Sequence, residues 1–240
     1  MAATTLNILC AGAVQGIVKA LQARFSDETG ATVNAKFGAV GAMKEALLDG
    51  EPCDVLIVTD TMIVALQSSA DLMAQARSPL GSVRTGVAVP EGHALPDVST
   101  PEALKAAMLA ASTIYFPDPQ RSTAGIHFAS VLRQLGIDQD VAGRLRTFPN
   151  GATAMREMSA DTRVDTNGRS AIGCTQVTEI NYTPAIRLAG PLPKAFELAT
   201  VYTAAVASRA TQPALAQRFV ELLAGPESLA LRRQGGFEFD

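Results

Sequence analysis

The sequence predicts an α/β fold of two lobes, in which mostly parallel sheets are covered by helices and a ligand cleft lies between the lobes. Short apolar runs that suit buried strands alternate with longer stretches whose apolar residues recur every three or four positions. Several of these runs lead directly into small or hydroxyl residues and a helix start, and such alternation is typical of parallel α/β layers. The 240 residues are enough for two lobes of about 100 to 120 residues each.

The first part of the chain repeats one pattern three times. Strands are predicted at residues 6–10, 32–37 and 54–59, and a helical pattern follows each of them. Gly30 is placed to end the first helix. The first two strands run into loops of small residues, at 11–13 and 38–41. We therefore expect two helix starts to lie side by side at one edge of a sheet.

The passage into a second lobe is predicted after the strand at residues 83–89, which a polar, proline-bearing loop and a helix at 102–110 follow. Extended segments at 187–193 and 198–206 return to the first lobe, and helices at 213–223 and 227–234 complete it. We predict lobe 1 from residues 1–84 and 196–240, and lobe 2 from residues 85–195.

The most informative stretch is residues 118–128, between a strand at 113–116 and a helix that Gly136 closes. Ser122 or Thr123 can cap this helix. The backbone N–H groups at a helix start have no internal partner and the helix dipole is positive there, so an anion is stabilised. Arg121 adds a planar cation that suits a carboxylate. A capped helix after a strand is also common in α/β domains without a ligand, so this pattern alone does not establish a site.

Composition excludes several classes of function. The chain has 20 Lys and Arg residues against 23 Asp and Glu residues, and the basic residues are scattered, so a nucleic-acid partner is not expected. No apolar run approaches the roughly 18 residues that a membrane span needs, so membrane insertion is not expected either. Three cysteines without paired spacing and two histidines predict no disulfide framework and no metal site. Residues 1–3 run into the first strand, so no signal peptide is expected within this sequence.

Five stretches together resemble the type II periplasmic solute-binding proteins, and within them the molybdate-binding group. They are residues 11–14, 38–41, 52–57, 118–128 and 172–180, which follow the order and spacing of that family over nearly the whole chain. The resemblance implies two α/β lobes that hold an anion with backbone N–H groups and hydroxyls. It also implies a periplasmic, bacterial setting. The ligand-binding residues it suggests here are Gly12, Ala13, Val14, Ala39, Val40, Gly41, Arg121, Ser122, Thr123, Thr175 and Gln176.

This sequence departs from the molybdate binders at the first two loops. Those proteins present a serine from each loop, whereas this chain has Ala11 and Ala13 in one and Ala39 and Val40 in the other. Each buried oxyanion oxygen left without a donor would cost about 1 to 3 kcal/mol. Together with Arg121, this favours a ligand that carries carboxylates.

One branch that resembles this chain, the aconitate isomerases, fits these changes. The resemblance implies a 1,3-allylic proton shift between trans- and cis-aconitate, with no cofactor. The shift needs a base, for which we suggest His127, the histidine nearest the loop; Glu179 and Lys36 are no better placed by sequence. The main alternative is a non-catalytic receptor for molybdate-like oxyanions or an organic acid, with an ABC permease as its partner. A ligand-binding lobe pair from a cytoplasmic regulator is a third alternative. A monomer is expected in each case.

Overall fold

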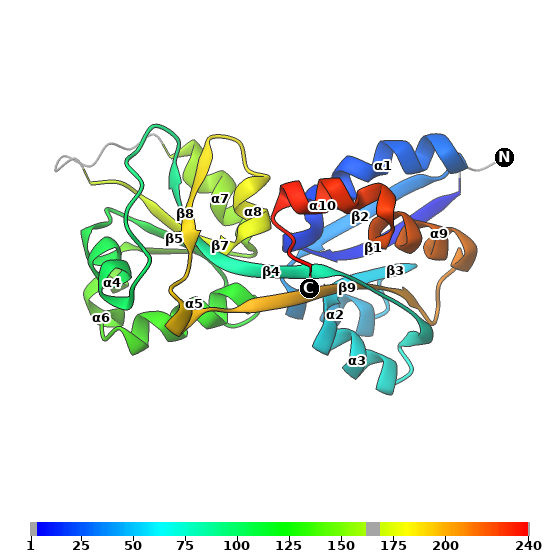
Figure 1. The fold of residues 1–240 in the computed structure, drawn as a ribbon. Coiled ribbons are helices and arrows are strands. Elements are labelled where there is room, and N and C mark those ends of the chain that lie inside the picture. Colours follow the sequence, from blue (N-terminus) through cyan, green and yellow to red (C-terminus); the bar gives the residue numbers. More distant parts are fainter. Residues whose placement is uncertain (1–3, 162–168, 240) are drawn as a thin grey trace. The chain divides into compact units, whose positions relative to one another are not determined.

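The computed structural model describes residues 4–161 and 169–239 and divides the chain into two compact units. Unit 1 comprises Met1–Val83 and Thr200–Asp240, and unit 2 comprises Arg84–Ala199. The chain passes from unit 1 to unit 2 within one long strand, β4 (Leu72–Pro90). Each unit is a sheet covered by helices, so the predicted α/β class is confirmed (Figure 1).

The sheet of unit 1 has the strand order β2-β1-β3-β9, followed by β4. Its further strands are β1 (Thr5–Ala11), β2 (Thr32–Gly38), β3 (Val55–Thr59) and β9 (Ala199–Ala207). β1 is parallel to both β2 and β3, whereas β9 is antiparallel to β3. The parallel core therefore covers the three strands that the sequence pattern located, and the returning segment adds an antiparallel strand.

Helices cover both faces of this sheet. In Figure 1, α1, α9 and α10 lie on one side of the strands and α2 and α3 on the other. The packing includes an edge-to-face contact of Phe25 with Phe219, with 5.0 Å between ring centroids. The helical segments are η1 (Gly12–Val14), α1 (Gln15–Thr29), α2 (Val40–Leu48), α3 (Asp60–Ser68), α9 (Pro213–Ala224), η4 (Pro226–Ser228) and α10 (Leu229–Gly235).

The sheet of unit 2 has the order β4-β7-β5-β6, and β8 also pairs with β4. β5 is parallel to β6 and β7, while β4 is antiparallel to β7 and β8. The strands are the second part of β4, β5 (Ile114–Pro117), β6 (Leu145–Phe148), β7 (Ile172–Gln176) and β8 (Ile186–Pro191). Because β5 lies between β7 and β6, the carboxyl ends of these three strands meet at one edge.

Each face of this sheet has its own hydrophobic core. Phe116 and Phe128 belong to the core under α4, α5 and α6, whereas Tyr115 and Met155 belong to the core under α7 and α8. Ile126, which follows the apolar spacing of α5, is nevertheless 48% exposed. The helical segments are α4 (Pro101–Ala110), α5 (Thr123–Gln134), α6 (Asp138–Val141), η2 (Ala142–Arg144), α7 (Gly151–Ala160), α8 (Val177–Asn181) and η3 (Lys194–Phe196).

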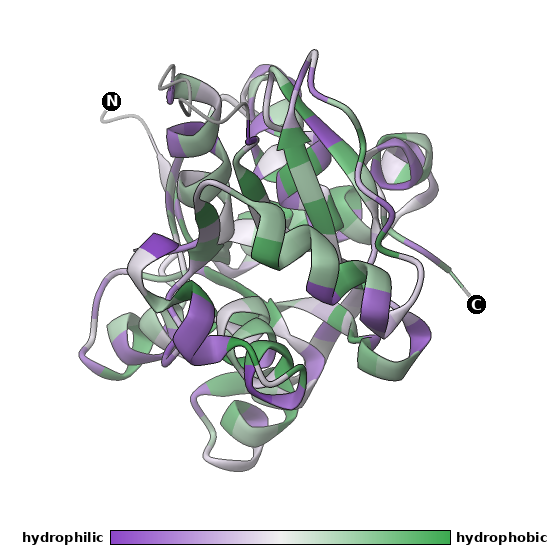
Figure 2. Ribbon diagram, turned by 90° about the vertical axis from the view of Figure 1, so that its left-hand side faces the viewer, coloured by the Kyte–Doolittle hydropathy of each residue, from purple (hydrophilic) through white to green (hydrophobic). Residues whose placement is uncertain are grey.

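Two strands differ from the sequence-based expectation. β4 begins eleven residues before the predicted strand at 83–89, because Arg77, Ser78 and Pro79 interrupt the apolar pattern without ending the strand. β6 was not predicted, since its four residues are all partly or fully exposed and show no apolar run. The other elements were predicted from the contrast between strongly hydrophobic strands and helices that carry both hydrophobic and hydrophilic residues. Figure 2 shows this contrast.

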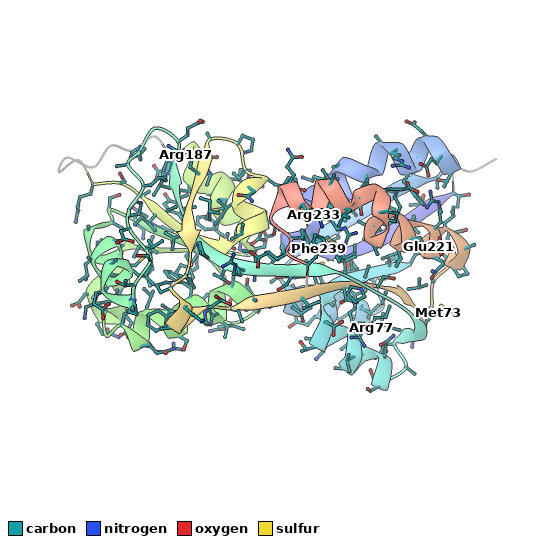
Figure 3. All side chains as sticks on the ribbon, viewed as in Figure 1. Met73, Arg77, Arg187, Glu221, Arg233 and Phe239 are labelled. Atoms are coloured by element: carbon teal, nitrogen blue, oxygen red, sulfur yellow. The ribbon has the colours of Figure 1, made fainter. Side chains whose placement is uncertain are left out.

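A buried arginine anchors the C-terminal segment of unit 1. Arg232 is only 4% exposed, and its guanidinium donates to the carbonyl oxygens of Leu80 (2.7 Å) and Ala224 (2.6 Å) and to the hydroxyl of Ser228 (3.1 Å). It also lies over the ring of Phe239, which Figure 3 shows next to Arg233. Burial lowers the pKa of Arg232, and its hydrogen bonds to the carbonyl groups compensate for the lost hydration.

We expect Arg232→Met to destabilise unit 1 by about 3 kcal/mol, because it leaves several buried carbonyl oxygens without donors. Urea unfolding followed by circular dichroism measures this loss. The exposed neighbour provides the control: Arg233→Met should change the unfolding free energy by less than about 0.5 kcal/mol. Equal effects from the two substitutions would contradict an anchoring role for Arg232.

Candidate functional site

In unit 1, the two small-residue loops lie next to each other at one edge of the sheet. β1 and β2 are paired in parallel register up to Ala11 opposite Gly38. Gly12, Ala13 and Val14 form η1 directly after β1. Ala39 is the N-cap of α2, and Val40 and Gly41 begin this helix after β2. The structure therefore brings together the six predicted ligand-binding residues of this unit.

The first turn of α2 offers backbone donors without acceptors. Ala39 has no side chain that could cap the helix, and the first intrahelical bond runs from the N–H of Met43 to the carbonyl of Ala39. Within the described residues, no acceptor faces the N–H groups of Val40, Gly41 and Ala42. These groups could donate to an anion, since a helix N-terminus carries partial positive charge.

The third loop at this edge carries a charged network. Asp60, the first residue of α3, accepts two hydrogen bonds from the guanidinium of Arg77, at 3.0 and 2.6 Å. It also accepts one from the hydroxyl of Thr203 at 2.7 Å. Figure 3 shows Arg77 below the strands of unit 1, on the side of α2 and α3. The pairing balances the charge of Asp60.

In unit 2, the stretch after β5 forms an ordered turn before α5. The carboxylate of Asp118 accepts hydrogen bonds from the N–H groups of Gln120 (2.7 Å) and Arg121 (3.2 Å), and its carbonyl accepts one from the N–H of Ser122 (3.1 Å). Ser122 is the N-cap of α5, but its buried side chain makes no capping bond. Arg121 is exposed, and Thr123 is the first residue of the helix.

The start of α5 sits so close to the end of β5 that only glycine fits there. A Cβ atom on Gly125 would lie 2.2 Å from the carbonyl oxygen of Asp118 and 2.4 Å from that of Pro117. As in α2, no acceptor in the described part of the chain faces the N–H groups of Thr123, Ala124 and Gly125. The start of α5 thus follows a parallel strand without a side-chain cap, as the start of α2 does.

At the start of α7, the other long helix at this edge, side chains of the protein itself accept hydrogen bonds from the backbone N–H groups. The N-cap residue Asn150 accepts a hydrogen bond from the N–H of Thr153 at 2.8 Å. The carboxylate of Glu179, a residue of α8, accepts from the N–H of Ala152 at 3.1 Å and from the hydroxyl of Thr175 at 2.5 Å. Glu179 is 6% exposed. An internal carboxylate therefore occupies the position where an external anion would bind.

Two opposing effects set the protonation of Glu179. Burial raises the pKa of its carboxyl group, while hydrogen bonds from Thr175 and from the backbone N–H groups of Ala152, Gln176 and Gly151 lower it. Burial is the larger effect, and the pKa is raised overall. Within residues 4–161 and 169–239, every group that donates to this carboxylate is uncharged, so no cation from this part of the chain offsets its burial.

The predicted residues at the end of β7 belong to this arrangement. Thr175 is fully buried, and its hydroxyl donates a hydrogen bond to the carboxylate of Glu179. Gln176 is the buried N-cap of the short helix α8. The sequence analysis treated Glu179 only as one candidate base. The four-residue spacing from Thr175 was visible in the sequence, but the meeting with Gly151 and Ala152 depends on the tertiary fold.

His127 lies in the second turn of α5 and is partly buried. Its Nε2 is 2.8 Å from the carbonyl oxygen of Phe196, which fixes this nitrogen as a donor. Nδ1 is then the nitrogen that could accept a proton. The three cysteines are buried free thiols; burial raises the pKa of Cys10 and Cys174, and raises that of Cys53 to about 12, so thiolate chemistry is not favoured.

Comparison with known proteins identifies the family. Residues 6–238 match the bacterial extracellular solute-binding protein family, and the chain belongs to that family. No helix in the described part of the chain has the length and apolarity needed to cross a membrane.

Individual relatives differ in what they do. The chain is 23% identical to an aconitate isomerase of a Pseudomonas species, over 98% of this chain and 88% of that protein. Its fold is similar to the periplasmic molybdate-binding protein of Azotobacter vinelandii, with a TM-score of 0.76, 19% identity, and coverage of 98% of this chain and 99% of that chain. It is also similar to Campylobacter jejuni PEB3 with bound L-phospholactate, with a TM-score of 0.67, 16% identity, and coverage of 98% and 100%.

The raised pKa of Glu179 predicts a specific pH dependence. Between the ordinary glutamate pKa of about 4.3 and the raised value, the folded protein binds more protons than the unfolded chain, so stability falls as pH increases. Urea unfolding between about pH 4 and pH 8 should show this fall, of about 1.4 kcal/mol per unit of raised pKa, relative to Glu179→Gln. A constant difference between the two proteins across this range would contradict the assignment.

Proposed function

We propose that this protein binds a small polycarboxylate and acts as an aconitate isomerase, interconverting trans- and cis-aconitate by a 1,3-allylic proton shift. The observation that carries the proposal is the similarity to the Pseudomonas aconitate isomerase, which extends over 98% of this chain. The identity to that enzyme is 23%, so the proposal also depends on whether the groups at the site suit the reaction.

The donors at the starts of α2 and α5 suit carboxylates. The starts of α2 and α5 each offer backbone N–H groups, and the loops of unit 1 present only Gly12, Ala13, Val14, Ala39, Val40 and Gly41, which have no hydroxyl. A compact tetrahedral oxyanion needs donors all round, whereas a carboxylate needs them on one side only. This donor set therefore favours an organic acid over molybdate.

Unit 2 adds the groups that an organic acid would need for tight binding. We infer that Arg121, Ser122 and Thr123 hold one carboxylate at the start of α5. Such donors also stabilise the negative charge that develops on a carboxylate when the adjacent carbon loses its proton. We include Thr175 and Gln176, the last two residues of β7, as further groups of the proposed site.

The reaction breaks one C–H bond and forms another. A base removes a proton from the methylene carbon, the electron pair is delocalised over the allyl system into the carboxylate, and a proton is returned at the far carbon. We propose His127 as the base, acting through Nδ1 because Nε2 is bonded to Phe196. No cofactor takes part in this scheme.

The alternative is a non-catalytic receptor, and the family itself favours it. A bacterial extracellular solute-binding protein would hold its ligand and present it to an ABC permease. The ligand would then be an organic acid or an oxyanion. In either case we propose a periplasmic, monomeric protein whose partner molecule is a small anion, with no nucleic acid and no membrane insertion.

Incubation with trans-aconitate in D2O, followed by proton NMR, tests the reaction. We expect cis-aconitate to appear at catalytic protein concentrations, with deuterium incorporated at the reacting carbons. His127→Gln should abolish this turnover while leaving the fold intact. Calorimetric titrations with citrate, molybdate and tungstate accompany the assay, and tight oxyanion binding without turnover would identify a transport receptor instead.

Arg121→Ala should weaken trans-aconitate binding by about 10- to 100-fold, because a charged hydrogen bond to a carboxylate is worth about 1.5 to 3 kcal/mol. Calorimetry measures the affinity, and circular dichroism checks the fold. Arg133→Ala is the matched control, since Arg133 is an exposed arginine in the last turn of α5, the helix that Arg121 precedes. An unchanged affinity in Arg121→Ala would remove this residue from the site.

A further inference from the structure

The two long helices that begin at the carboxyl edge of the unit 2 sheet differ in how their first N–H groups are satisfied. α5 follows β5 and has an N-cap that makes no side-chain bond, whereas α7 follows β6 and is capped by Asn150. The carboxylate of Glu179 then takes the N–H of Ala152 as well. One helix start is open, and its neighbour is already occupied by the carboxyl group of Glu179.

The occupied position has the properties of an anion site. Three backbone N–H groups, of Gly151, Ala152 and Gln176, and the hydroxyl of Thr175 converge on one carboxylate. They come from the ends of two strands, β6 and β7, on either side of β5. We call this set of four donors the α7 cradle.

The backbone is shaped so that a carboxylate can enter the cradle. A Cβ atom on Gly151 would lie 1.8 Å from the hydroxyl oxygen of Thr175 and 2.0 Å from a carboxylate oxygen of Glu179. Any other residue at this position would displace the carboxylate or its donor. The absence of a side chain at Gly151 leaves the space that the carboxylate and its donor occupy. This evidence for a carboxylate position does not depend on the helix dipole.

We propose that the α7 cradle is a second carboxylate-binding site of unit 2, that Glu179 is its built-in occupant, and that Glu179 is thereby a specificity-determining residue. With the cradle filled, a ligand carboxylate is directed to the start of α5. This last step rests on the proposed function, whereas the existence of the cradle does not.

The charge of Glu179 also selects among ligands. Adjacent strands are about 4.8 Å apart, so a carboxylate that bridges the ends of β7 and β6 lies within about 10 Å of the end of β5. The groups that donate to Glu179 from α7 and β7 are Gly151, Ala152, Thr175 and Gln176, all of them uncharged. Among the described residues, no cation donates to Glu179 and screens its charge from a ligand at α5, so each further negative charge on the ligand is disfavoured.

Chemical rescue tests the cradle directly. Glu179→Ala empties it, and formate is small enough to replace the lost carboxylate. We expect formate to raise the Tm of this variant by about 2–4 °C once it exceeds its Kd several-fold, relative to chloride at equal ionic strength. Parent protein, Glu179→Gln and Glu157→Ala, which removes an exposed carboxylate of α7, should not respond. A response no larger in Glu179→Ala than in these controls would overturn the proposal.

If Glu179→Ala does not fold, a refolding experiment tests the cradle instead. Glu179→Ala is then refolded from urea with increasing formate or chloride, and the yield of folded protein is followed by circular dichroism. Recovery that increases with formate alone supports the cradle. Equal recovery in both salts, or none in either, would overturn it.

The effect on ligand choice is measured with trans-aconitate. Glu179→Gln keeps the size of the side chain and removes its charge, so trans-aconitate should bind about tenfold more tightly, by the Coulomb energy at about 10 Å and an effective dielectric constant of about 20. An unchanged or weaker affinity would overturn the specificity role. If the parent protein does not bind trans-aconitate at all, the proposed function fails, and the formate experiment still decides on the cradle.

Discussion

The requirement that every buried backbone N–H group finds an acceptor governs how this protein can bind anions. Each helix that follows a strand begins with N–H groups that the helix itself cannot satisfy. α4 satisfies one of them with the hydroxyl of Thr100, and α7 does so with Asn150 and Glu179. α2 and α5 have no such side chain. These two helices are among those that the family resemblance associates with ligand binding, although α3 and α9, which it does not, also lack a side-chain cap.

Sequence reasoning located the candidate site because local chemistry determines strand ends and helix starts. Gly30 adopts the left-handed conformation that ends α1, and the small residues after β1 and β2 stand next to each other because the strands are paired in parallel. The same reasoning failed where an element has no local signature. β6 is short and exposed, and the polar residues within β4 conceal its length, so both strands exist through pairing with neighbours distant in sequence.

The α7 cradle could not be predicted from the sequence, for the same physical reason. Glu179 and its backbone donor Ala152 are 27 residues apart, and no periodicity or spacing connects Glu179 with Gly151 and Ala152. Only the parallel arrangement of β7, β5 and β6 brings these segments to one edge. By contrast, Arg121, Ser122 and Thr123 lie within one loop, and their proximity follows from the sequence alone.

Among the described residues, two carboxylates are buried, Asp54 and Glu179, and they differ in how their burial is compensated. Asp54 lies just before β3, at the edge of the unit 1 sheet opposite to the small-residue loops, and accepts hydrogen bonds from Asn7, Thr211 and Gln212. Burial acts to raise the pKa of Asp54, but these hydrogen bonds outweigh it and the pKa is lowered. Asp54 therefore stays ionised and fastens three segments together.

Glu179 accepts a similar number of hydrogen bonds, yet for this carboxyl group the effect of burial is larger than theirs and its pKa is raised. Its ionised form is therefore less favourable, relative to its protonated form, than that of an ordinary glutamate. Asp54 shows that hydrogen bonds can keep a buried carboxylate ionised, whereas the hydrogen bonds to Glu179 do not outweigh its burial. Glu179 also lies at the sheet edge where α5 begins, which is the position that the proposed specificity role requires.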